Sequence, residues 1–315
     1  MAIVIWFVLA LLCQTMMIME SKLKFVEYGN PKGKTVVYFH GAPGSPDECS
    51  IFDKHGKEYG LNIICYDRFA TESSLQGKDY YQNLADVIKN KVNDGKVDLI
   101  GFSIGCHVAL ETSLYLGDQV RNLHLIAPAA PLDEGNFLDG MAGGVIFSLA
   151  MNYPAVFTLL SYWQSLLAKL TPNLLFKILF ASAAGKDKEL TRSSDFEKYI
   201  TPILKSCFSK NLKGYIRDIN QYVAPWKVRI NECKLNTYIW HGASDNWSPV
   251  SMAEYLADMI PGCKNTEVMN GVSHYSCLFE SAPKICQQLA EGVQVRDTKI
   301  LIADALRPNT EVGLP

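Results

Sequence analysis

Short runs of apolar, often β-branched residues alternate along the chain with longer amphipathic stretches. Six of these runs predict strands: KTVVYFHG (34–41), LNIICYDR (61–68), VDLIG (97–101), VRNLHLIAPAA (120–130), LNTYIWHG (235–242) and TEVMNG (266–271). In DYYQNLADVIKNKV, the residues Leu84, Val87, Ile88 and Val92 recur at helical spacing. Apolar strands separated by helices are typical of a mostly parallel sheet covered on both faces, so the pattern predicts an α/β fold.

The alternation stops between residues 131 and 225. This stretch contains GGVIFSLAMNYPAVFTLLSYWQSLLAKL and PNLLFKILFASAAG, which are apolar but contain no clear strand. The strand–helix pattern then resumes. We therefore expect a core of residues 20–130 and 226–292, an inserted helical cap over residues 131–225, and a C-terminal tail, 293–315, to which we assign no function.

An uncharged apolar segment, MAIVIWFVLALLCQTMMIM, occupies residues 1–19. Its length is near the lower limit for a membrane span. It lacks the basic start and the small-residue cleavage site of a secretory signal. Three interpretations stay open: a membrane anchor, a signal, or a mis-assigned start with Met19 as the true first residue. Membrane association through this segment is therefore one hypothesis.

The composition narrows the classes of function. Hydrophobic residues make up 48% of the chain and charged residues 20%, as in a folded globular protein. The formal net charge of −2, without a basic patch, argues against a nucleic-acid partner. Nine cysteines without C-x-x-C spacing argue against a zinc cluster and favour small buried hydrophobes in a reducing, cytoplasmic compartment.

The strongest chemical signal is G-F-S-I-G at residues 101–105. It follows the VDLI run and precedes GCHVALETSLYLG, which is the strand–turn–helix context of a nucleophile elbow. Glycines permit the tight turn, which lifts the Ser103 hydroxyl to the carboxyl edge of the sheet. At the start of the following helix, the backbone N–H of Ile104 is free to bind an oxyanion.

A serine hydroxyl needs an adjacent base to act as a nucleophile, and six histidines are available. His274, in NGVSHYS, lies on a predicted loop after the last strand, from which it can reach Ser103. The other five lie in or at the end of strands, on the elbow helix or in a charged stretch: His40, His55, His107, His124 and His241. We therefore assign the base to His274.

The third member of a triad orients the imidazole and stabilises its charged form. Asp245, in WHGASDNWSP, directly follows a predicted strand, although aspartate is also common in turns. Asp258 falls in a helix, and Asp133 and Asp218 fall in the predicted cap. Asp245 is therefore the better candidate, and Ser, Asp and His follow one another in the order expected for this kind of site.

The loop HGAPGS at residues 40–45 is the candidate for the second oxyanion donor. Pro43 has no N–H, so Ala42 is the predicted donor. Gly41 and Gly44 allow the backbone to approach a substrate closely. We predict Gly41 and Phe102 as substrate contacts.

Together, HGAPGS, the YDR strand end at 66–68, GFSIG, HGASDNWSP and GVSHYS resemble the α/β-hydrolase superfamily over about residues 22–289. The resemblance implies acyl transfer through a covalent acyl-enzyme on Ser103, without a metal or organic cofactor. Ser103 argues against the epoxide hydrolase and haloalkane dehalogenase branches, whose nucleophile is aspartate. Proline iminopeptidases usually have HGGPG and a tryptophan after the nucleophile, where this chain has Ala42 and Ile104.

The chain also departs from the R-P-G-x-G-x-S pattern that many members have after the second strand, because residues 68–73 read RFATES. We expect this loop to border the pocket, so the substrates of relatives are a poor guide. The predicted cap is rich in apolar residues: Ile146, Phe147, Leu149, Phe157, Leu159, Leu160, Trp163, Leu166, Leu167, Leu175, Phe176, Ile178, Leu179 and Phe180. They pack the cap on the core, or they form an acyl pocket or a membrane-facing lid.

The leading hypothesis is a serine hydrolase that cleaves a lipophilic carboxylic ester, a small-molecule substrate. A thioesterase, an amidase or a C–C bond hydrolase would use the same residues. A non-catalytic binding protein that retains the fold is a further alternative.

Overall fold

The structure is a computed structural model, and it describes residues 23–93 and 95–291. The apolar segment 1–19 and the tail 293–315 lie outside the described residues, as do the hypotheses made for them. Within the described residues, no helix combines the length and the apolar character needed to cross a bilayer.

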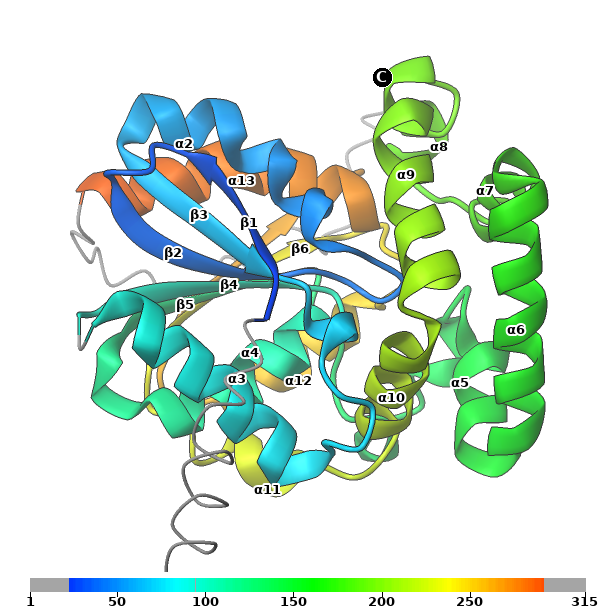
Figure 1. The fold of residues 1–315 in the computed structure, drawn as a ribbon, viewed down its shortest axis with the longest axis horizontal. Helices are drawn as coiled ribbons and strands as arrows, with labels where there is room; N and C mark the ends of the chain where they lie inside the picture. The colour runs from blue at the N-terminus through cyan, green and yellow to red at the C-terminus, as the bar shows by residue number, and fades with distance from the viewer. Residues whose placement is uncertain (1–22, 94, 292–315) are drawn as a thin grey trace, which may run out of the picture.

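A seven-stranded sheet forms the centre of the molecule (Figure 1). Its strands are β1 (Phe25–Gly29), β2 (Lys34–Phe39), β3 (Leu61–Tyr66), β4 (Val97–Phe102), β5 (Val120–Ile126), β6 (Asn236–Gly242) and β7 (Cys263–Met269). The order across the sheet is β1-β3-β2-β4-β5-β6-β7, and every neighbouring pair is parallel except β1 with β3. The predicted α/β fold with a mostly parallel sheet is confirmed, and β1 is an additional strand that the apolar pattern does not predict.

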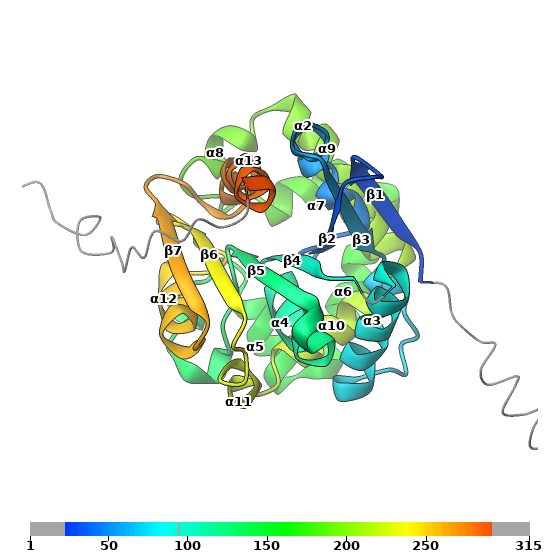
Figure 2. The same ribbon diagram turned by 90° about the vertical axis from the view of Figure 1, so that its left-hand side faces the viewer.

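Helices cover both faces of the sheet (Figure 2). On one face lie α2 (Asp53–Tyr59) and α13 (His274–Glu291), which contact each other. On the other face lie α3 (Gly77–Val92), α4 (Gly105–Leu116) and α12 (Val250–Met259). Because both faces are covered, β3 and β4 are buried along their whole length, which explains their unbroken apolar sequences.

The segment between β5 and β6 is mostly helical, and its helices α5–α10 lie at one end of the sheet (Figure 1). The helices are α5 (Gly144–Asn152), α6 (Pro154–Leu170), α7 (Pro172–Leu179), α8 (Asp187–Leu190), α9 (Ser194–Lys210), α10 (Leu212–Tyr222) and the short α11 (Lys227–Ile230) before β6. Short 3-10 turns are η1 (Pro46–Phe52), η2 (Arg68–Ala70), η3 (Gly117–Gln119), η4 (Leu132–Glu134) and η5 (Leu138–Gly140). We refer to α5–α10 as the cap helices.

A buried ion pair ties the cap helices to the sheet. Arg68, the first residue of η2 after β3, lies 2.9 Å from the Asp218 carboxylate on α10, and both side chains are almost fully buried. Arg217 donates to the same carboxylate and to the Arg68 carbonyl. Breaking a buried pair leaves an uncompensated charge, so this network fixes α10 relative to the core.

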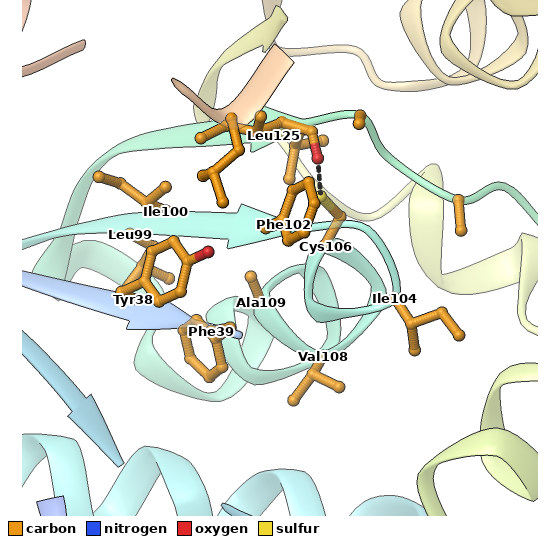
Figure 3. Close-up of a cluster of buried hydrophobic side chains, with 14 of the residues drawn as sticks. Tyr38, Phe39, Leu99, Ile100, Phe102, Ile104, Cys106, Val108, Ala109 and Leu125 are labelled. Atoms are coloured by element: carbon orange, nitrogen blue, oxygen red, sulfur yellow. Dashed lines mark hydrogen bonds between the residues drawn. The ribbon is translucent and has the colours of Figure 1, made fainter. Parts of the chain in front are cut away.

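The apolar core lies on both sides of β2 and β4, directly behind the candidate nucleophile. Figure 3 shows Phe102, Val108 and Leu125 in this cluster, with Cys106 close to the end of β5. The Cys106 thiol lies 3.5 Å from the Ile126 carbonyl. The eight described cysteines are free, and all except Cys263 are buried, as the sequence predicted for most of them.

Candidate active site

Ser103 occupies a strained turn between β4 and α4. Its φ is +55°, a left-handed conformation that non-glycine residues rarely adopt. A Cβ at Gly101 would lie 2.6 Å from the Cys106 Cα, and one at Gly105 would lie 2.2 Å from the Phe39 carbonyl oxygen. Only glycine fits at either position, so the two glycines of G-x-S-x-G let α4 pack close against β2 and β4.

The turn lies where the strand order reverses. The chain passes from β2 outward to β3 and then returns across β2 to form β4 on its other side. In open α/β sheets, ligands bind at the carboxyl ends of the strands beside such a switch point. Here those ends lead into the 40–45 loop and the Ser103 turn, whose strands pair at Phe39 and Gly101.

The segments that follow β6 and β7 bring Asp245 and His274 together. His274 Nδ1 lies 2.8 Å from Asp245 Oδ2. The second carboxylate oxygen, Oδ1, accepts hydrogen bonds from the backbone N–H groups of Trp247 and Ser248 at 2.8 and 2.9 Å. With Nδ1 bound to the carboxylate, Nε2 is the nitrogen available to another group.

The pKa values of the pair shift in opposite directions. Burial alone would raise the pKa of Asp245, but the charge and hydrogen bond of His274, with help from His241 and the Ser248 N–H, hold it below its ordinary value. Burial alone would lower the pKa of His274, but Asp245, Asp187 and Glu48 together raise it. Mutual stabilisation of the two charged forms is the physical cause.

The sequence predicted a loop at His274. In the structure, His274 is instead the first residue of α13. Its ring is stacked on Trp247 at 5.4 Å and lies 4.8 Å from the Phe102 ring. Because Phe102 directly precedes Ser103, this contact places the imidazole beside the turn that carries the serine.

Two backbone N–H groups near Ser103 are free of protein acceptors within residues 23–93 and 95–291. These belong to Ala42 and Ile104, the predicted oxyanion donors. Their neighbours are engaged: the Gly41 N–H donates to Glu48, and the Ser103 N–H donates to the Ile126 carbonyl. Ala42, Ser103 and Ile104 all line the same cavity.

This cavity has a volume of about 290 Å³ and lies between the sheet and the cap helices. Its walls include Met141, Phe147, Leu160, Trp163 and Leu179, and no charged side chain is among the described residues that line it. Apolar walls with a few polar groups are typical of small-molecule sites.

Gly41 and Phe102, the predicted substrate contacts, do not line this cavity. Phe102 is fully buried behind Ser103, and Gly41 is held by Glu48. The expectation that the 68–73 loop borders the pocket is wrong. None of its residues lines the cavity, because Phe69 packs instead against Gly214 of α10.

Glu48 is a buried acid that the sequence did not single out. Its Oε1 accepts from Tyr38 Oη at 2.8 Å and from the Gly41 N–H at 2.7 Å, whereas Oε2 has no partner within the described structure. Burial raises its pKa to about 7, although both hydrogen bonds and the charges of Arg68 and His274 oppose that shift. A glutamate in the polar stretch PDEC gives no sequence signal of burial.

Asp187 of α8 is a second acid that the sequence did not single out. It accepts from the backbone N–H groups of Tyr275 and Ser276 at 2.9 and 2.8 Å, so a cap residue satisfies the first turn of α13. Nearby, the Lys186 N–H donates to the Gly271 carbonyl, and Asn246 Nδ2 donates to the Ser182 carbonyl. Residues 182–187 therefore touch both segments that supply Asp245 and His274.

One of the remaining histidines, His241, lies beside the Asp245–His274 pair, with its Nε2 3.9 Å from Asp245 Oδ2. His107 is buried against Trp226, and His124 accepts from the Trp240 indole within the sheet. His40 contacts Arg68, and His241 contacts the Ser248 carbonyl. Within the described chain, no three histidine, cysteine or acidic side chains gather as a metal site would require.

The chain belongs to the α/β-hydrolase fold family, whose pattern it matches over residues 34–281, and this confirms the predicted resemblance. Among solved structures, a bromoperoxidase from Bacillus anthracis shares 17% identity and a TM-score of 0.60, with 85% of this chain and 94% of that chain covered.

Two esterases are also similar. The esterase from Exiguobacterium antarcticum shares 16% identity and a TM-score of 0.58, with 85% of this chain and 94% of that chain covered. A thermophilic esterase from Thermogutta terrifontis shares 17% identity and a TM-score of 0.61, with 85% of this chain and 92% of that chain covered. At these identities the likeness establishes the fold. A comparison with curated protein sequences gave no match.

Proposed function

We propose that this chain is a serine hydrolase that cleaves carboxylic esters with an apolar acyl group, using Ser103 as nucleophile. The observation that carries the proposal is the position of Ser103. Ser103 lies on a strained turn and lines an uncharged apolar cavity together with Ala42 and Ile104. The preceding residue, Phe102, contacts the ring of His274, which is paired with Asp245.

In the proposed mechanism, His274 Nε2 takes the proton from the Ser103 hydroxyl as Oγ attacks the ester carbonyl carbon. The N–H groups of Ala42 and Ile104 stabilise the resulting oxyanion. His274 then gives the proton to the leaving alcohol, and the C–O bond to that alcohol breaks. A water, deprotonated by His274, releases the acid from the acyl-enzyme by the same steps.

Asp245 holds the His274 imidazole in the tautomer that the proposed reaction steps require. Its bond to Nδ1 keeps Nε2 unprotonated before the attack, and its charge stabilises the imidazolium that forms. The charge and hydrogen bond of His274 favour the ionised carboxylate, and the two backbone N–H groups on Oδ1 fix its orientation.

The test is hydrolysis of p-nitrophenyl esters from acetate to palmitate. The cavity of about 290 Å³ is near the lower end of ligand pockets. We therefore expect the highest kcat/KM for acyl chains of intermediate length. Ser103→Ala should lose turnover by about 10⁴-fold or more. Ser113→Ala is the matched control, because Ser113 lies on α4 and its hydroxyl donates to the Leu110 carbonyl.

Turnover that survives in Ser103→Ala would overturn the serine mechanism. Activity with the corresponding thioesters or anilides but not with oxygen esters would assign the same residues to a thioesterase or an amidase. A wild-type protein that turns over none of these substrates would contradict the hydrolase and favour a binding role.

A further inference from the structure

Large apolar side chains are exposed on one part of the described structure far more than on the rest. They lie on α5, α6 and α7, and the six most exposed are Val145, Tyr153, Leu159, Tyr162, Leu166 and Leu170. Elsewhere in the described residues, only Phe25 and Val228 are comparable. We call the exposed apolar residues of α5–α7 the cap face.

Helix α6 is more apolar on its outer side than on its inner side. Its buried residues are Phe157, Ser161, Gln164, Ser165 and Ala168, three of which are polar. Its outer side carries Val156, Leu159 and Leu166 at spacings of three and seven residues, and Leu159 is 71% exposed. A surface helix of a soluble domain normally has polar residues on that side, so the outer stripe requires a separate explanation.

The three helices form one continuous surface. Helix α6 packs against both α5 and α7, and in Figure 1 the three lie at the edge of the molecule farthest from the sheet. Tyr153 and Tyr162 are on this surface with Trp163. Tyrosine and tryptophan are the residues enriched where protein meets the interface of a bilayer.

The charge of this region is one-sided. Residues 141–185 contain no aspartate or glutamate, and their only charged residues are Lys169 and Lys177, both exposed. A second copy of this chain would bring lysines toward lysines with no acid on the face to pair with them. An anionic lipid surface offers the complementary charge together with an apolar interior.

The cap face and the cavity share two residues. Trp163 and Ile178 are 48% and 44% exposed, and both also line the cavity that contains Ser103. The apolar surface is therefore continuous with the apolar walls around the serine. A lipophilic molecule held in a bilayer could pass along this route without crossing water.

We propose that the cap face docks on the surface of an anionic lipid bilayer, with the mouth of the Ser103 cavity turned toward the lipid. The docking does not depend on the proposed catalysis. It can therefore be measured in Ser103→Ala, which cannot consume the lipid by the proposed mechanism.

The experiment is co-sedimentation of the full chain, as Ser103→Ala, with vesicles of phosphatidylcholine alone or mixed with phosphatidylglycerol. We expect binding to the mixed vesicles that weakens with salt. Adding Leu159→Glu, Leu166→Glu and Leu170→Glu together should reduce the partition coefficient by roughly tenfold or more. Phe25→Glu with Val228→Glu is the control, because both residues are exposed but lie outside the cap face.

A second variant separates charge from apolar contact. Lys169→Gln with Lys177→Gln leaves the leucines in place and should remove the preference for phosphatidylglycerol. Circular dichroism and unfolding in urea verify that each variant is folded.

The proposal is overturned if the full chain does not bind the mixed vesicles. It is also overturned if the folded triple variant binds as the parent does, since residues 1–19 or another surface would then be responsible. A parent that is dimeric in solution and a triple variant that is monomeric would assign the cap face to self-association instead.

Discussion

Each oxygen of the Asp245 carboxylate has its own partner. Oδ2 accepts from His274, and Oδ1 accepts from two backbone N–H groups, so the side chain has no freedom to turn away. Charge-assisted hydrogen bonds of this kind keep a buried carboxylate ionised. At the scale of single residues, the candidate site is therefore organised around a fixed acid that sets the orientation of the base.

Glu48 differs from Asp245 because one of its oxygens has no partner among the described residues. Burial raises its pKa to about 7 from an ordinary value of 4.5. A group with a raised folded-state pKa contributes stability that is present below its unfolded pKa and is lost as the pH rises through the folded one. Between about pH 4.5 and 7, ionisation of Glu48 therefore works against the folded state.

Glu48→Gln tests whether ionisation of Glu48 lowers the stability of the folded state. Glutamine keeps an acceptor for Tyr38 and Gly41 but cannot ionise. We expect the free energy of unfolding of the variant to rise relative to wild type by roughly 3 kcal/mol on going from about pH 5 to about pH 8. Urea unfolding at both pH values measures it, and a difference that does not change with pH would contradict the assignment.

The residues of the proposed triad could be chosen from the sequence because each follows a predicted strand in a glycine-containing turn. Glu48 and Asp187 could not. Glu48 is bound by Tyr38 and Gly41, and Asp187 is bound by the start of α13. The local sequence around each acid does not indicate these partners. A polar residue within a polar stretch carries no periodic signal of what will cover it.

At the scale of elements, the short α8 completes the N-terminus of α13. The first N–H groups of a helix have no partner within it, and Asp187 supplies one from the cap helices for Tyr275 and Ser276. The Ser273 N–H donates to Ser276 Oγ, which adds a local cap. The orientation of His274, at the start of α13, therefore depends on a residue of the cap.

Asp187→Asn should lower activity through His274. The Asp187 charge is one of the causes that raise the pKa of His274, so removing it should lower that pKa. The acid limb of kcat/KM, where His274 becomes protonated, should then move to lower pH, and kcat should fall by about tenfold from loosened positioning.

Asp195→Asn is the matched control, since Asp195 also lies in the first turn of a cap helix but is exposed. Its pH profile should equal that of wild type. If Asp187→Asn lowers kcat and leaves the acid limb in place, Asp187 has a structural role only.

Strands were predicted well where they are buried on both faces, because such strands read as continuous apolar runs. β1 was not predicted, since FVEYG has only five residues and lies at the edge, half-exposed and antiparallel to β3. The start of α13 at His274 was also missed, because the partner that completes its first turn is Asp187, which is far away in the sequence.

At the scale of the whole molecule, the cavity unites segments from Ala42 to Ser248. The sequence predicted that the cap is helical and apolar but left open whether its side chains pack inward, line a pocket or face a membrane. All three environments occur: Phe157 is buried, Leu160 lines the cavity and Leu159 is exposed. The helical pattern alone cannot separate them, because consecutive or nearby apolar residues of α6 fall in all three environments.

The most direct test of the central claim is covalent labelling with a fluorophosphonate, followed by intact-mass measurement. An activated serine displaces fluoride and retains the phosphonyl group, and this adduct resembles the oxyanion intermediate. We predict one adduct on wild type and on Ser113→Ala, with none on Ser103→Ala. An adduct that persists in Ser103→Ala, or a folded wild-type protein that takes up no label, would contradict the assignment of Ser103 as the nucleophile.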